Sequence, residues 1–132
     1  MNTKIVMTVS SVVLGVTGIF LTFAPDIVLS NLKTNTDPVS VLLGQVIGGL
    51  YFGYGMLNWM TKESLIGGIY NRPIVVANLT HFLIAGLAIC KSLTSNQALP
   101  KALWAAGAVY VALGLFFVII LFRHPIKEDK QQ

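Results

Sequence analysis

Charged residues are scarce in this sequence. They make up 11% of its 132 residues, against roughly 25% in a typical soluble domain. Hydrophobic residues make up 55%. A soluble fold of this size could not cover its surface with so few charges, whereas lipid solvates most of the exterior of a membrane protein. The composition therefore predicts an integral membrane protein.

Cysteine is almost absent, since Cys90 is the single one in the chain. A lone cysteine excludes an internal disulfide and a thiolate metal cluster, and we interpret Cys90 as a small apolar residue near a helix end. The net charge of +4 does not indicate a nucleic-acid partner, because the basic residues stand singly at the ends of apolar runs. We therefore expect no metal, no cofactor and no nucleic acid.

Four uncharged stretches are long enough to cross a bilayer. They cover residues 5–24, 39–60, 73–90 and 102–122, close to the ~20 residues that a hydrocarbon core of ~30 Å requires. Segment 25–32 mixes polar and apolar residues, which is typical of a short helix at the membrane interface, and 127–132 is predicted to fray. The sequence thus predicts an all-α, four-helix transmembrane bundle, with residues 1–132 in a single domain.

The basic residues predict an orientation. Six lie on one side of the predicted membrane and three on the other. Because cytoplasmic loops carry the excess of Lys and Arg, both termini are predicted to face the cytoplasm. The larger group is Lys4, Lys62, Arg72, Arg123, Lys127 and Lys130, and the smaller group is Lys33, Lys91 and Lys101.

Polar residues inside the spans are the candidate binding residues, because polar groups in hydrocarbon are costly. Asn78 and His81 are three residues apart and share one helix face. Three tyrosines fall at a depth similar to that of His81, and Gln45 is predicted to point inward. If these side chains turn toward the bundle centre, they could hold a lipid-like head or a quinone-like ring. The candidate set is His81, Asn78, Gln45, Tyr51, Tyr54 and Tyr110.

His81 has two interpretations. It could join helices by a hydrogen bond to a tyrosine or a backbone carbonyl. It could instead act as a ligand contact, a proton relay or a haem ligand. Haem ligation by two histidines is the weakest of these, because His124 lies beyond the end of the fourth span. A second copy of His81, in a symmetric dimer, would have to supply the partner.

The second span carries glycines at a spacing that favours close helix contact. Gly44 and Gly48 are four residues apart, as are Gly49 and Gly53, and small residues at this spacing let backbones approach. A different stripe carries Tyr51, Tyr54 and Asn58. One stripe is expected to face the bundle and the other a second copy, so we predict a homo-oligomer.

Several short motifs resemble those of the DoxX-like superfamily. They are Phe23-Ala24-Pro25 after the first span, Gly48-Gly49-Leu50-Tyr51 in the second, and Asn71-Arg72-Pro73 before the third. The resemblance implies a small four-helix protein of a bacterial inner membrane. It also implies a possible accessory role, because some members are described as accessory subunits of membrane oxidoreductases. Members often carry an arginine before the second-span glycines, where this chain has Gln45.

Three classes of function stay open. The first is a non-enzymatic binding or accessory subunit that holds a lipid-like or quinone-like molecule or contacts a membrane-protein partner. The second is a component of a redox or lipid-modifying enzyme that uses His81. A small transporter or channel ranks last, because the predicted spans contain no carboxylate of the kind that coupled export ordinarily uses.

Overall fold

The computed structural model describes residues 2–64, 66, 69–96 and 98–122, and these residues form helices without any strand. The all-α prediction is therefore confirmed. Four of the helices are long and apolar enough to cross a membrane, and the chain is an integral membrane protein. The elements are α1 (Thr3–Phe23), α2 (Pro25–Asn31), α3 (Pro38–Thr61), the 3-10 helix η1 (Ile69–Asn71), α4 (Arg72–Ser95) and α5 (Ala102–Phe122).

Local sequence signals set most of the helix starts. Pro25 begins α2, and Pro38 begins α3 directly after the N-cap residue Asp37. The Asp37 carboxylate accepts hydrogen bonds from the backbone N–H groups of Val39 and Ser40, at 3.0 and 3.1 Å. These bonds satisfy donors that the first helical turn leaves free. A hydrogen bond from the Ser40 hydroxyl is the main cause of a lowered pKa at Asp37, and these backbone bonds lower the pKa further.

The third long helix extends further than its uncharged sequence. We predicted a span over 73–90, but α4 continues to Ser95 and includes Lys91. The Lys91 side chain is exposed, and a lysine near a helix end can keep its ammonium group in water while the helix continues. The predicted fraying tail 127–132 and His124 lie outside the described residues.

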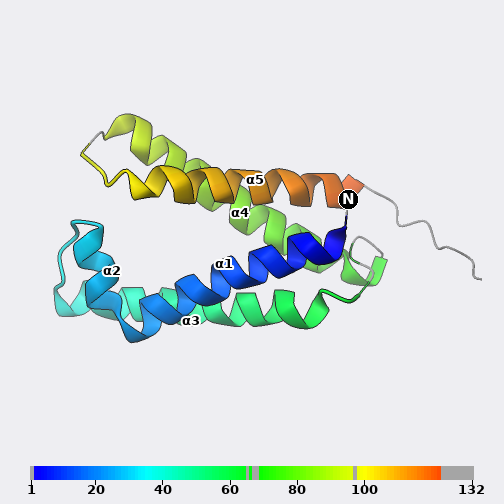
Figure 1. The fold of residues 1–132 in the computed structure, drawn as a ribbon, viewed down its shortest axis with the longest axis horizontal. Coiled ribbons are helices and arrows are strands. Elements are labelled where there is room, and N and C mark those ends of the chain that lie inside the picture. The colour runs from blue at the N-terminus through cyan, green and yellow to red at the C-terminus, as the bar shows by residue number, and fades with distance from the viewer. Residues whose placement is uncertain (1, 65, 67–68, 97, 123–132) are drawn as a thin grey trace, which may run out of the picture.

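The four long helices form two antiparallel pairs. Helix α1 packs along α3, and α4 packs along α5 (Figure 1). Between the pairs, the described backbones come close only where α1 meets α5. Helix α2 packs on α1 and α3 at one end of the molecule, here named the α2 end. The opposite end, which holds the amino terminus and the α3–α4 connection, is named the amino-terminal end.

Glycines bring α1 and α3 into close contact. A Cβ added to Gly48 would lie 2.5 Å from Thr22 Oγ1 and 2.9 Å from the backbone oxygen of Gly18, and one added to Gly55 would lie 2.8 Å from the Gly15 nitrogen. The Ser11 hydroxyl also donates to the Gly55 carbonyl at 2.7 Å. The pair is therefore held by backbone-to-backbone packing, as in other small-residue helix contacts.

The predicted packing glycines divide into two groups. Gly44 and Gly48 are buried, and a Cβ on Gly44 would lie 3.6 Å from Pro25 Cβ. Gly49 and Gly53 are exposed, and a Cβ on either would meet nothing within 4 Å. Only the first two pack inside this chain, so the second two lie on a face that is open to lipid or to another chain.

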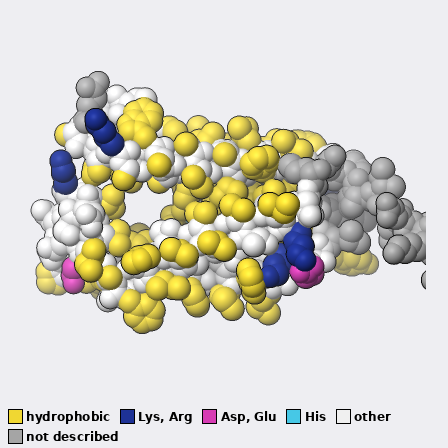
Figure 2. Space-filling model, in the orientation of Figure 1, with side chains coloured by type: hydrophobic (Ala, Val, Ile, Leu, Met, Phe, Trp, Pro, Cys, Tyr) yellow, Lys and Arg dark blue, Asp and Glu magenta, His cyan; other side chains and the backbone are white. Residues whose placement is uncertain are grey.

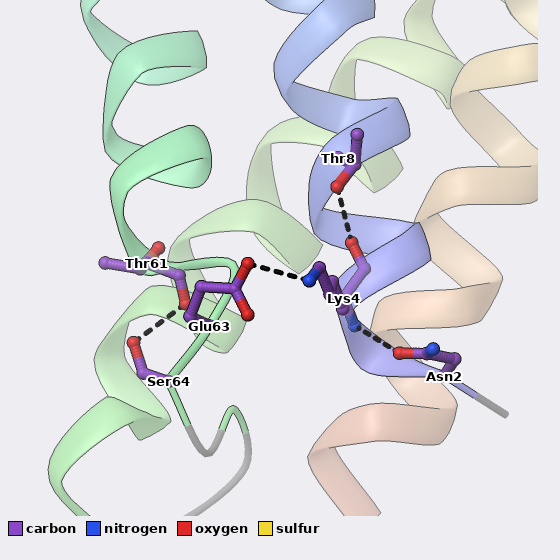
Figure 3. A network of polar contacts seen from close by, with 6 residues as sticks. All are labelled: Asn2, Lys4, Thr8, Thr61, Glu63 and Ser64. Carbon is purple, nitrogen blue, oxygen red and sulfur yellow. Dashed lines mark hydrogen bonds and ion pairs between the residues drawn. The ribbon is translucent and has the colours of Figure 1, made fainter.

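A polar network ties α1 to the α3–α4 connection at the amino-terminal end (Figure 3). Lys4 Nζ lies 2.8 Å from Glu63 Oε1. The Lys4 backbone N–H donates to Asn2 Oδ1 at 3.0 Å, and its carbonyl accepts from the Thr8 hydroxyl at 2.8 Å. The hydrogen bond with Lys4 is the main cause of a lowered pKa at Glu63. Both side chains are exposed, so the ion pair contributes little to stability.

Candidate functional site: an aromatic cage around His81

Four aromatic rings surround the His81 imidazole. Its ring centroid lies 5.1 Å from that of Phe82, 5.2 Å from Tyr51, 5.4 Å from Tyr54 and 5.7 Å from Tyr110. These rings, which we name the cage, come from α3, α4 and α5. The sequence predicted that Tyr51, Tyr54 and Tyr110 lie at the depth of His81, and the structure brings all three against it. Ring pairs at these separations stabilise one another.

The Nε2 atom of His81 is buried and has no hydrogen-bond partner within the described part of the chain. Buried polar atoms in proteins are nearly always paired, and each ring nitrogen of an imidazole can donate or accept. The Nε2 atom is thus a polar group inside a ring of aromatic side chains that the described residues leave without a partner.

Asn78 has a structural role in this arrangement. Its Nδ2 donates to Asn58 Oδ1 at 2.8 Å and to the Ile74 carbonyl at 2.9 Å, and its Oδ1 accepts from Asn58 Nδ2 at 2.7 Å. Asn58 Nδ2 also donates to the Ser10 hydroxyl at 3.1 Å. Asn58, Asn78 and Ser10 are buried and link α3, α4 and α1. We name them the amide clasp.

The prediction that Gln45 points inward is wrong, because its side chain is exposed. Its neighbour Gly44 and the next turn's Gly48 are the residues that face α1. One residue along a helix is a rotation of about 100°, which places Gln45 on the outer side of α3 with Gly49 and Gly53. Gln45 is therefore not part of the cage.

An opening separates the two helix pairs toward the α2 end. Figure 2 shows this gap, whereas hydrophobic side chains fill the space between the pairs toward the amino-terminal end. Helical spacing places Ile47 of α3 one turn from Tyr51, and Ala85 and Ala88 of α4 one and two turns from His81.

The cage residues and the amide clasp include no Asp, Glu, Lys or Arg, and the described charged side chains lie toward the two ends of the molecule (Figure 2). Within residues 2–122, omitting the undescribed positions, no group of three or more His, Cys, Asp or Glu side chains is placed to hold a metal. Comparison with protein-family models, curated proteins and solved structures gives no match.

Proposed function

We propose that this protein is a non-enzymatic binding or accessory subunit of a membrane, which holds a lipid-like or quinone-like molecule with its polar group against His81. One observation carries the proposal: the Nε2 atom is buried and unpaired inside the cage. A carbonyl or hydroxyl oxygen on the bound molecule would supply the missing hydrogen bond. Such a bond gains strength in an environment of low dielectric constant.

The rings of the cage meet His81 at different angles. Tyr51 meets His81 edge-on with an interplanar angle of 87°, whereas Tyr54 is tilted by 40° and Tyr110 by 50°. Aromatic side chains offer large apolar area with a polar hydroxyl at one end. Pockets for small molecules typically combine such a lining with a few polar contacts, and His81 Nε2 is a polar atom of the cage that has no partner among the described residues.

The same residues favour binding over catalysis. A catalytic histidine is ordinarily oriented by a third group and paired with a nucleophile or substrate proton. Among the described residues, His81 contacts four aromatic rings, and its Nε2 atom has no hydrogen-bond partner. A molecule would be held in the cage, and any chemistry on it would belong to a partner.

This proposal agrees with the DoxX-like resemblance, which implies an accessory role beside a membrane enzyme. We also propose a bacterial inner membrane and an amino-terminal end that faces the cytoplasm. The orientation is supported by the excess of Lys and Arg residues that the sequence assigns to that side of the membrane. Labelling of single cysteines placed at Asn2 and at Thr36 from each side of intact cells would test it.

Native mass spectrometry of protein released from nanodiscs tests the binding function. We expect a bound small molecule at fixed stoichiometry on the wild type and its loss from His81→Ala. Thr80→Ala is the matched control, because Thr80 is adjacent but exposed, and it should keep the molecule. An empty wild-type protein, or equal occupancy in His81→Ala, would remove the proposal.

A further inference from the structure

Helical spacing predicts an apolar lining for the opening between the helix pairs. The positions predicted to line it lie one or two helical turns toward the α2 end from a residue of the core or the cage, namely Leu14, Tyr51, His81 or Tyr110. Ile47 and Ala88 are exposed, and the remaining positions are half-buried. The predicted lining comprises Thr17 and Leu21 of α1, Ile47 of α3, Ala85 and Ala88 of α4, and Ala106 of α5.

Such an opening has to be filled when the protein is in a bilayer. An empty space deprives its lining of dispersion contacts, and water is held inside proteins only where several polar partners are present. Thr17 is the one lining side chain with a hydroxyl group. Hydrocarbon is therefore the occupant that the lining favours.

The polar end of this occupant lies deep in the membrane. His81 is nine residues after Arg72, the first residue of α4, which corresponds to about 13 Å along a helix in a hydrocarbon core of about 30 Å. An ordinary phospholipid keeps its charged head at the interface. A charged head beside His81 would need a countercharge, and the cage contains no Lys or Arg.

We propose that the molecule held in the cage is a neutral long-chain amphiphile, with its polar head on His81 and its hydrocarbon chain in the opening toward the α2 end. The inference rests on the proposed function and adds the charge of the ligand and the path of its tail. It excludes phospholipids and other lipids with charged heads from this site.

Photolabelling in phosphatidylcholine vesicles tests the tail path. The probe is a long-chain primary alcohol with a diazirine at mid-chain, and labelled residues are located by mass spectrometry. We expect labels on Ile47, Ala85 and Ala88 rather than on Ile84 and Leu87, which face outward with 63% and 58% exposure. Excess unlabelled alcohol should abolish labelling of the opening, whereas the phosphate ester of the same alcohol should leave it intact.

A variant with a bulky side chain in the opening gives a second test of the tail path. Ala88→Phe should lose the labelling at Ile47, whereas Ile84→Phe on the lipid-facing side of α4 should retain it. Labelling of Ile84 and Leu87 as strong as that of the opening would overturn the tail path. Competition by the phosphate ester as strong as that by the alcohol would overturn the neutral head.

Native mass spectrometry separates the two proposals. A His81-dependent molecule found without labels in the opening would overturn this inference and leave the binding function standing. The absence of any His81-dependent molecule would overturn both.

Discussion

Asn58 and Asn78 hydrogen-bond to each other in both directions, with Asn58 Nδ2 2.7 Å from Asn78 Oδ1 and Asn78 Nδ2 2.8 Å from Asn58 Oδ1. Both side chains are fully buried. The pair joins α3 to α4 at a place where the two backbones are not in close contact. The amide clasp therefore holds the helix pairs together at the amino-terminal side of the cage, while the opening separates them toward the α2 end.

A double-mutant cycle on Asn58→Leu and Asn78→Leu should reveal this coupling. Each single change leaves the Oδ1 atom of the other amide buried without a partner, while its Nδ2 keeps a bond to Ser10 or to the Ile74 carbonyl, and it is expected to lower the free energy of unfolding by about 1–3 kcal/mol. The double change removes both polar groups, so its effect should be smaller than the sum. We expect a coupling of about 0.6–1.7 kcal/mol, the range found for hydrogen bonds between membrane helices, from reversible unfolding in bicelles. Additive losses would contradict the clasp.

Gly48→Ala should loosen the contact between α1 and α3. The added Cβ would lie 2.5 Å from Thr22 Oγ1 and 2.7 Å from the Thr22 nitrogen, and backbone atoms cannot move aside without shifting a helix. Overpacking of this kind costs about 1–3 kcal/mol, measured as the free energy of unfolding. Gly49→Ala is the control, because its Cβ would meet nothing within 4 Å. Equal stability of the two variants would mean that the close contact is not needed.

Gln45→Leu should weaken self-association and leave the stability of the monomer unchanged. Gln45 is exposed beside Gly49 and Gly53 on a membrane-spanning helix, where an amide gains by pairing with an amide of a second copy. Energy transfer between labelled copies in vesicles, measured over a range of protein-to-lipid ratios, gives the association constant. Gln45→Asn should retain part of the association. A wild type that stays monomeric at every ratio would remove the predicted homo-oligomer.

Acidic pH should release the tie between Lys4 and Glu63. The pKa of Glu63 is lowered below its ordinary value of 4.5, chiefly by the hydrogen bond with Lys4. A group with a lowered folded pKa contributes stability above its unfolded pKa and loses it as the pH falls through the folded value. The free energy of unfolding of the wild type should therefore be slightly higher than that of Glu63→Gln at neutral pH, and the two values should converge in acid. A difference that persists in acid would assign the effect to another group.

The sequence predicted the helices and the cage more successfully than the way the helices pair. Length and hydrophobicity locate the spans. The similar depth of Tyr51, Tyr54 and Tyr110 in the membrane indicated that they lie near His81, and the structure places their rings against it. The rotation of α3 about its own axis was not predicted correctly. Gly44 and Gly49 lie on two faces of the helix that both carry small residues, and only packing against α1 determines which face turns inward. That choice turns Gln45 outward.

Two other features had no usable sequence signal. The Ser10 hydroxyl belongs to the amide clasp, but serines are common in membrane helices and nothing marks this one. The opening depends on which helices pair, and the sequence of Ala85 and Ala88 would suit a close helix contact equally well. Both features arise from tertiary arrangement and not from local pattern.

His81→Phe offers a test in which stability and binding change in opposite directions. The imidazole Nε2 is buried without a partner, and an unpaired buried polar atom costs about 1–3 kcal/mol. Phenylalanine keeps an aromatic ring among the rings of Tyr51, Tyr54 and Phe82 and removes that atom. The ligand-free variant should therefore be at least as stable as the ligand-free wild type, while native mass spectrometry should find that it has lost the bound molecule. Binding sites commonly sacrifice stability in this way. Phe117→Leu is the control for aromatic packing, because Phe117 is a buried ring that stacks on Phe82 outside the cage, so it should lower stability and keep His81-dependent binding. If His81→Phe instead lowers the free energy of unfolding by several kcal/mol, His81 is a structural link between the helix pairs, and the cage is packing and not a binding site.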